Sequence, residues 1–326
     1  MARSDLLVSL VRAGRRGDRL LLKRTVDAIV AEERAKQHNL LADTLEKEIR
    51  LNDVPGNGLT ISDDRMVNLI FEMSPERQME DLILPEVVKK GCAELVEEHH
   101  RRDLLRSYNL KPRNRVLLEG PPGNGKTSLA EALSSALMVP MIIVRYEGVI
   151  GTYLGETAVR LKRVFDYVST RNCVLFFDEF DTLGKERGDV HETGEIKRVV
   201  SSLLLQIDAL PSHVIVITAT NHAELLDRAV WRRFQIQFSL PRPSRNQATE
   251  WFERFAKRNK MEIGYAPHTL ADKLKGCNYS ELEDFGETIL RKYILSLPEA
   301  NLKNITKDCL EQWQARMKVA NKKKIE

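Results

Sequence analysis

The chain has 326 residues, of which 42% are hydrophobic and 30% are charged. This balance provides for a buried core spread over two or three domains, and it excludes collagen-like, mucin-like and wholly disordered chains. The formal net charge of +4 is too small to require a polyanionic partner by itself.

Features that report on the cellular compartment point to the cytoplasm. The longest apolar runs, such as Val174–Phe177 and Val214–Ile217, are far shorter than the roughly 18–20 residues of a membrane span. The N-terminus has no apolar signal core. The four cysteines are widely spaced, which predicts free thiols in a reducing compartment and neither a disulfide framework nor a zinc site. We therefore expect a cytoplasmic protein with no membrane partner.

Residues 1–50 are predicted to form a small helical domain that binds a partner. Apolar residues recur there at three- and four-residue spacing in two stretches: Leu22, Val26, Ile29 and Val30, then Leu41, Leu45 and Ile49. Basic residues crowd the first 24 positions, which is typical of a solvated helix face but leaves contact with nucleic acid open. Residues 51–74 are predicted to be a linker because of the turn-rich stretch Asn52–Gly58. Whether residues 58–71 also form a short strand is left open.

Residues 75–243 are predicted to form an α/β domain. Its expected strands are residues 116–118, 141–144, 173–177, 214–218 and 235–238. Its expected helices are residues 85–107, 128–137, 159–168 and 196–207. Continuous apolar strands that alternate with helices are typical of a parallel sheet covered by helices on both faces. After Pro243 the strands stop, and residues 244–326 are predicted to form a helical lid with helices over 248–258, 280–296 and 304–319.

The sequence after the first of these strands fits the pattern G-x-x-x-x-G-K-T. It reads Gly120-Pro121-Pro122-Gly123-Asn124-Gly125-Lys126-Thr127, and Ser128 follows at the start of a helix. The glycines let backbone N–H groups curl around phosphate oxygens, and the helix N-terminus adds positive potential. Lys126 can reach the β- and γ-phosphates, and the Thr127 hydroxyl can ligate Mg²⁺. A strand before the loop and a helix after it favour this interpretation over an ordinary glycine turn.

Two acidic residues follow the strand at residues 173–177. Asp178 is expected at the carboxyl end of the strand, where it can hold the magnesium shell. Glu179 beside it can polarise the attacking water. Such a pair alone would more often be a solvated strand end, but its combination with the phosphate loop favours the catalytic role.

Three further features extend the predicted site. Asn221 follows the strand at residues 214–218, which places an amide side chain beside the γ-phosphate region. Arg232 and Arg233 lie between a helix and a short strand, where either could serve the γ-phosphate of an adjacent subunit; a surface ion pair is the alternative. Tyr153-Leu154-Gly155 places an aromatic residue on a glycine-flanked loop, which favours gripping a ligand over packing against the following helix.

Together these motifs resemble those of the AAA+ ATPases, over about residues 81–295. Within that family they are most similar to the clade of katanin, spastin and the motor domains of bacterial AAA proteases, and to small bacterial AAA ATPases with a helical N-terminal domain. The resemblance implies ATP and Mg²⁺ as cofactors and a homo-oligomeric, hexameric ring. It assigns a Walker A loop (Gly120–Thr127), a Walker B strand (Val174–Glu179), sensor 1 (Asn221), paired arginine fingers (Arg232 and Arg233) and a pore loop (Tyr153-Leu154-Gly155). It further implies a second pore loop at residues 187–192 and an adenine-contacting segment at residues 81–85.

The chain departs from the family pattern at two places. The family's Phe-Ser-Gly-Ala-Asp at the lid helix reads Tyr279-Ser280-Glu281-Leu282-Glu283 here, and Ser280 with Glu283 is expected to form a capping box. The family's Arg-Pro-Gly-Arg is contracted to the adjacent Arg232 and Arg233, which leaves open which of the two is the finger.

The leading functional hypothesis is a Mg-ATP-driven ring motor that remodels or unfolds protein substrates through a central pore. A separate protease is a candidate partner, because the chain has neither H-E-x-x-H nor G-x-S-x-G. The alternative is a nucleic-acid-acting AAA+ ATPase, such as a loader or helicase accessory. Tyr153 favours a protein substrate, whereas the basic N-terminal residues keep the alternative open. A nucleotide-switched scaffold is disfavoured because Glu179 and both arginines are present.

Overall fold

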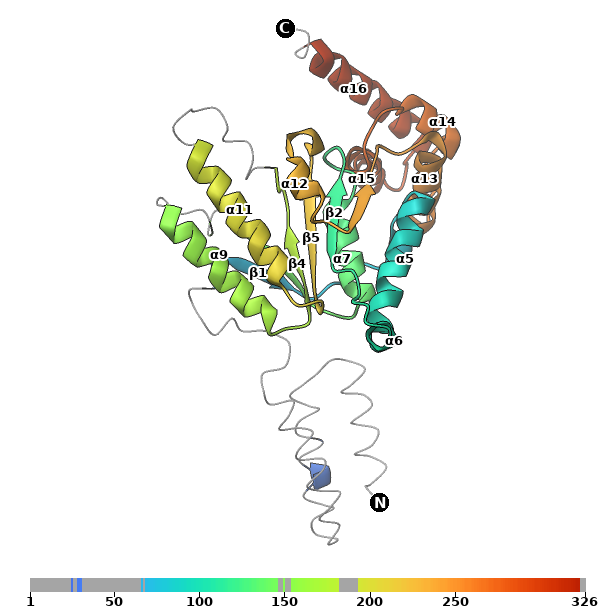
Figure 1. The fold of residues 1–326 in the computed structure, drawn as a ribbon. Helices are drawn as coiled ribbons and strands as arrows, with labels where there is room; N and C mark the ends of the chain where they lie inside the picture. Colours follow the sequence, from blue (N-terminus) through green and yellow to red (C-terminus); the bar gives the residue numbers. More distant parts are fainter. Residues whose placement is uncertain are drawn as a thin grey trace. The chain divides into compact units, whose positions relative to one another are not determined.

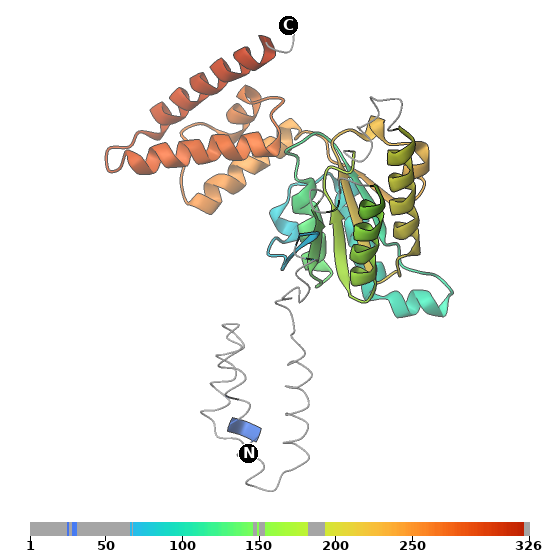
Figure 2. The ribbon, with the colours of Figure 1, turned by 90° about the vertical axis from the view of Figure 1, so that its left-hand side faces the viewer.

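The computed structural model describes residues 68–145, 154–181 and 193–322, together with positions 25, 28–30, 66 and 149. The chain divides into two compact units, residues 1–64 and residues 65–326. Apart from positions 25, 28–30 and 66, the predicted N-terminal helical domain and most of the predicted linker lie outside the described residues. The second unit contains a central sheet, the helices that cover it and a C-terminal group of helices (Figures 1 and 2).

A six-stranded sheet forms the centre of the second unit, in the order β1-β3-β4-β5-β2-β6. Its strands are β1 (Ile70–Met73), β2 (Arg115–Glu119), β3 (Met141–Val144), β4 (Cys173–Phe177), β5 (Val214–Thr220) and β6 (Ile236–Ser239). From β3 to β6 every neighbouring pair is parallel, and β4 and β5 are buried along their whole length. The continuous apolar character of these two strands follows from helices on both faces of the sheet.

Helices cover both faces of the sheet (Figure 1). The covering helices are α5 (Glu86–His100), α7 (Lys126–Ala136), α9 (Leu154–Ser169) and α11 (Thr193–Ala209), with the short α6 (Arg102–Ser107) after α5. Successive strand residues point to opposite faces: Phe176 packs in the core formed with α5 and α7, whereas Phe177 stacks on Phe165 of α9. The predicted α/β sandwich is thus confirmed in the described part of the chain.

The first strand answers a point that the sequence left open, whether residues 58–71 contain a strand. Residues 70–73 form β1, which pairs antiparallel with β3 so that Ile70 lies opposite Val144. The strand has four residues at the sheet edge, and only Ile70 among them is buried. Such a segment shows neither alternation nor a continuous apolar run, so the sequence did not predict this antiparallel pair at the edge of the mostly parallel sheet. The helix expected over residues 85–107 is also interrupted, at Arg101.

Four helices form the lid after the sheet ends. They are α13 (Arg245–Asn259), α14 (Pro267–Lys273), α15 (Tyr279–Leu295) and α16 (Leu302–Lys322), and α15 and α16 lie side by side (Figure 2). The lid has its own aromatic core, in which Phe252 and Phe285 meet edge to face. The seven-residue α14 was missed because it is too short to show a helical period.

The four cysteines are all buried and unpaired, as the sequence predicts. Among the residues that the structure describes, no helix has both the length and the apolar character needed to cross a membrane.

Candidate functional site

The loop between β2 and α7 needs glycine at two positions for different reasons. A Cβ at Gly120, whose φ is 143°, would overlap the carbonyl oxygen of Leu240. A Cβ at Gly123, whose φ is 74°, would lie 2.9 Å from the side chain of Asn278 in the lid. Only glycine adopts these backbone angles without strain and allows such close approach. The loop then turns into α7, whose first residue is Lys126 and whose free N–H groups favour a bound anion.

Lys126 joins the phosphate loop to the end of β5. Its Nζ donates hydrogen bonds to the carbonyl oxygens of Gly120 (2.6 Å) and Pro121 (3.0 Å), and to Oδ1 of Asn221 (2.7 Å). Burial lowers the pKa of the Lys126 ammonium, whereas the carboxylates of Asp178 and Asp181 act to raise it. The structure thus brings together Lys126 and Asn221, which are 95 residues apart in the chain.

The two acidic residues after β4 lie beside the loop. Thr127 Oγ1 donates to Oδ2 of Asp178 at 3.0 Å, and Asp178 Oδ1 accepts from the backbone N–H of Glu179 at 2.9 Å. Glu179 has a φ of 47°, which is uncommon for a residue with a side chain and is found most often at functional sites. The hydroxyl of Thr127 and the carboxylate of Asp178 are adjacent oxygen donors, the ligand type that Mg²⁺ prefers.

A buried carboxylate that the sequence analysis missed supports Asn221. Asp181 is 1% exposed, and its Oδ1 accepts from the Thr220 hydroxyl at 3.1 Å and from the backbone N–H of Asn221 at 3.3 Å. These bonds fix the turn that carries the Asn221 amide toward Lys126. An acid so soon after Glu179, beside the apolar Phe180, was the signal that could have identified it.

The cap of α15 differs from the one expected. Asn278 is the N-cap, because its Oδ1 accepts from the backbone N–H of Glu281 and the Glu281 carboxylate accepts from that of Asn278, both at 2.7 Å. The predicted box of Ser280 and Glu283 was therefore wrong; asparagine caps as well as serine, and the helix begins two residues earlier. Glu283 instead pairs with Arg258 at 2.7 Å.

The first turn of α15 is bonded to the phosphate loop and to the segment before α5. Asn278 Nδ2 donates to the carbonyl oxygen of Pro122 (3.2 Å), and the backbone N–H of Ser280 donates to that of Gly123 (3.0 Å). The Tyr279 hydroxyl donates to the carbonyl oxygen of Ile83 at 3.0 Å. Burial raises the pKa of the Tyr279 phenol, so the hydroxyl keeps its proton at neutral pH.

Tyr279 is the first residue of α15. Its hydrogen bond to Ile83 therefore adds a link between the lid and the segment that resembles the adenine-contacting one. We expect Tyr279→Phe to weaken ATP binding about fivefold, since a lost hydrogen bond costs about 1 kcal/mol, and to leave the maximal turnover nearly unchanged. Titration with a fluorescent ATP analogue measures this, and Tyr108→Phe, at a tyrosine that is 73% exposed, is the matched control. Equal affinities of wild type and Tyr279→Phe for the ATP analogue would contradict this prediction.

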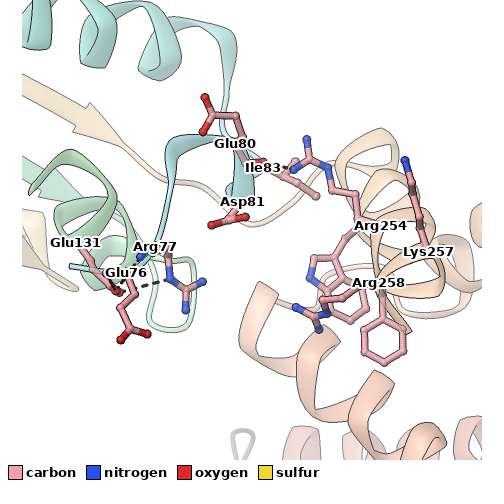
Figure 3. Close-up of a pocket in the computed structure, with 11 residues that line it drawn as sticks. Glu76, Arg77, Glu80, Asp81, Ile83, Glu131, Arg254, Lys257 and Arg258 are labelled. Carbon is pink, nitrogen blue, oxygen red and sulfur yellow. Dashed lines mark hydrogen bonds and ion pairs between the residues drawn. The ribbon is translucent and has the colours of Figure 1, made fainter. Parts of the chain in front are cut away.

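The site opens into a cavity of about 610 Å³ between the α/β domain and the lid. Its lining includes Pro122, Gly123, Asn124, Gly125, Lys126, Thr127, Ser128, Asp178, Glu179 and Asn221, together with Ile83, Trp251 and Tyr279. A second cavity of about 780 Å³ shares five lining residues with the first: Arg77, Asp81, Ile83, Trp251 and Arg258. Figure 3 shows this second cavity, where Nη1 of Arg254 in α13 donates to the backbone carbonyl oxygen of Glu80 at 2.6 Å. The first cavity is large enough for a nucleotide without the volume of the second.

The structure does not bring every predicted residue to this cavity. Arg232 and Arg233 follow α12 (Arg228–Trp231) and do not line the cavity. Tyr153 and residues 187–192 lie outside the described part of the chain, and Leu154 and Gly155 are described only as the first backbone positions of α9. The cavity therefore has a phosphate loop, adjacent oxygen donors and an amide, and the arginines that line it, Arg77 and Arg258, come from the segment before α5 and from α13.

The known proteins that this chain resembles are AAA ATPases. The family described as "ATPase family associated with various cellular activities (AAA)" matches residues 116–242. An uncharacterized AAA family ATPase of Sinorhizobium fredii is 33% identical over 291 residues, which are 87% of this chain and 87% of that protein.

Two further relatives are matched over shorter stretches. A protein of Methanothermobacter marburgensis that carries the name of a 26S proteasome regulatory subunit homolog is 29% identical over 65% of this chain. A protein of Corynebacterium diphtheriae named as an AAA ATPase forming ring-shaped complexes is 31% identical over 64% of this chain. The matches span 57% and 47% of these two relatives' own lengths.

Proposed function

This chain belongs to the AAA family of ATPases, and we propose that it is a Mg-ATP-driven ring motor that remodels or unfolds protein substrates through a central pore. ATP hydrolysis follows from membership of the family. The single observation that carries the proposed site is the meeting of Lys126, Asn221 and the pair Thr127–Asp178 at the phosphate loop. Glu179 directly follows Asp178 at this edge of the sheet.

Each residue of the site has a proposed role. Lys126 and the loop N–H groups bind the β- and γ-phosphates, and Thr127 with Asp178 holds Mg²⁺. When bound, Mg²⁺ neutralises charge on the phosphate oxygens. Glu179 orients and polarises the attacking water. Asn221 holds the Lys126 ammonium in place and contacts the γ-phosphate. An arginine from a neighbouring subunit completes the site, because in the described residues neither arginine of the pair lines the cavity of its own subunit.

A ring that acts on proteins is supported by the names of relatives and by the predicted pore loop. One relative is named as forming ring-shaped complexes, and another is named for a proteasome regulatory subunit. The second name also favours a separate protease as the partner of this chain. Capture of co-purifying proteins on a Glu179→Gln variant, which is expected to hold ATP, tests for that partner.

The pore proposal predicts that substrate handling separates from hydrolysis. Tyr153→Ala should keep most ATP turnover and ring formation but lose substrate unfolding, because the proposed aromatic grip on the polypeptide is removed. The measurement is the fluorescence of a fluorescent-protein substrate beside phosphate release. Tyr108→Ala, at an exposed tyrosine next to α6, is the matched control and should unfold substrate like wild type. Full unfolding by Tyr153→Ala would rule out gripping by this residue.

The alternative of a nucleic-acid-acting ATPase rests on the basic residues of the first 24 positions. The two functions are told apart by what stimulates phosphate release. We expect an unfolded polypeptide to stimulate it and single-stranded DNA to have no effect. Stimulation by DNA of any sequence would favour the alternative.

A further inference from the structure

The segment between β1 and α5 leaves the sheet, and carboxylates accept from its backbone N–H groups. Oε1 of Glu131 in α7 accepts from the N–H groups of Glu76 and Arg77, both at 3.2 Å (Figure 3). Oδ2 of Asp81 accepts from the next N–H group, that of Gln78, at 2.8 Å. Backbone donors that lie beyond the end of a strand need other acceptors. Two carboxylates therefore hold three consecutive N–H groups of this segment.

The side of α7 makes two further contacts with the same segment. Oε2 of Glu131, whose side chain is only 18% exposed, lies 3.5 Å from Nε of Arg77. Oγ of Ser135 accepts from Nε2 of Gln78 at 3.0 Å. Glu131 and Ser135 share one face of α7, because residues four apart in a helix lie one above the other. The segment is thus attached to the side of the helix whose first residue is Lys126.

The other end of the segment forms part of the wall of the nucleotide cavity. Asp81 and Ile83 both line that cavity. Two lid residues are bonded to this end: Arg254 donates to the carbonyl oxygen of Glu80 at 2.6 Å, and Tyr279 donates to that of Ile83 at 3.0 Å. The position of this wall therefore depends on attachments at both ends of the segment, to α7 and to the lid.

A single rigid element connects this wall to the phosphate loop. Lys126 and Glu131 belong to the same helix and are about 7.5 Å apart along its axis. A nucleotide that spans the cavity meets the phosphate loop at one end and the segment at the other, so α7 sets the distance between its two binding surfaces. A surface that is already ordered costs a ligand less conformational entropy on binding.

We propose that Glu131 is a positioning residue that fixes the wall of the cavity facing the nucleoside, and that it sets the affinity for ATP without taking part in hydrolysis. This inference rests on the proposed ATP site, and it gives a role to a carboxylate that does not line the nucleotide cavity. Without the carboxylate, the N–H groups of Glu76 and Arg77 lose their acceptor, and the ligand must order residues 76–83 itself. The affinity then falls for ligands that contact the segment, and not for ligands that contact only the phosphate loop.

Glu131→Ala tests this role with two ligands. Alanine is the best helix former, so α7 should be retained. ATP should bind about tenfold more weakly, since a hydrogen bond to a charged group contributes about a factor of ten or more. Inorganic tripolyphosphate, which has neither base nor sugar, should bind as it does to wild type. The turnover number at saturating ATP should also be unchanged, so that only the KM rises. Titration calorimetry measures both affinities, and phosphate release measures turnover.

Two further variants separate positioning from a general structural defect. Glu97→Ala, the matched control, removes a carboxylate of α5 that is 64% exposed and pairs with Arg101 at 2.8 Å; it should bind both ligands like wild type. Glu131→Gln keeps an oxygen that can accept from the two N–H groups, so it should recover most of the affinity for ATP. Unchanged affinity of Glu131→Ala for ATP, or an equal loss for tripolyphosphate, would overturn the proposal. If wild type binds neither ligand, it is the proposed ATP site that fails.

Hydrogen exchange of the wild-type chain gives a test that needs no variant to fold. The amide groups of residues 76–78 should exchange slowly before any nucleotide is added, because carboxylates accept from them. ATP should slow exchange over residues 76–83 further, and tripolyphosphate should not. Exchange of residues 76–78 at the rate of an unstructured peptide would show that the carboxylates do not hold the segment, and would overturn the proposal.

Discussion

Glu179→Gln should bind ATP with nearly wild-type affinity and hydrolyse it at least ~10²-fold more slowly, since loss of a positioned base costs ~10²–10⁴ in rate. Glutamine keeps the shape of the side chain, but it cannot accept the proton of the attacking water. The backbone at this position is already held in the left-handed region by the fold, so the substitution should not move the side chain away. Phosphate release under saturating ATP measures the loss, and binding of a fluorescent ATP analogue measures the affinity.

Lys126→Ala provides the contrast for this result. Its ammonium is bonded to the phosphate loop and to Asn221, so its removal should abolish nucleotide binding rather than the chemical step alone. Equal turnover of Glu179→Gln and wild type would remove Glu179 from the mechanism.

Arg232→Ala should bind ATP normally and lose about 10³-fold in turnover, the lower end of the effect of an arginine finger on phosphoryl transfer. The residue is absent from the lining of its own subunit's cavity, so the affinity of that subunit for ATP has no reason to change. Wild-type activity should rise with protein concentration as subunits assemble, whereas the variant should stay slow at every concentration. A normal turnover number for assembled Arg232→Ala would exclude it as the trans-acting group.

The phosphate loop, the acidic pair and Asn221 were predictable because their residues are defined by local pattern. Gly120 and Asp178 each directly follow an apolar strand, Lys126 begins the helix after the loop, and parallel strands bring their carboxyl ends to one edge of the sheet. The structure gathers Lys126, Asp178 and Asn221 at that edge, as the sequence suggested. The predicted functions of these residues remain proposals.

The features that sequence reasoning missed depend on tertiary contacts. Asp181 and Asp208 are ordinary acids in the sequence, and only the fold shows that one supports Asn221 and the other pairs with Arg115 and Arg233. The strand β1 is an edge strand with one buried side chain, so it has no period to detect. The capping box of α15 was misplaced because two overlapping S/N-x-x-E patterns compete, and the contact of Asn278 with the phosphate loop favours the earlier one.

The central claim is that each ATP site is shared between subunits, and mixing two inactive variants tests it most directly. Glu179→Gln lacks the water-orienting carboxylate but carries Arg232. Arg232→Ala keeps the carboxylate of Glu179 but lacks the arginine. In mixed rings, some Arg232→Ala sites lie beside a Glu179→Gln subunit and receive its arginine. Phosphate release by the mixture should be well above the sum of the two variants measured separately, with a maximum at an intermediate ratio. Release equal to that sum at every ratio, in assemblies shown to contain both variants, would contradict it.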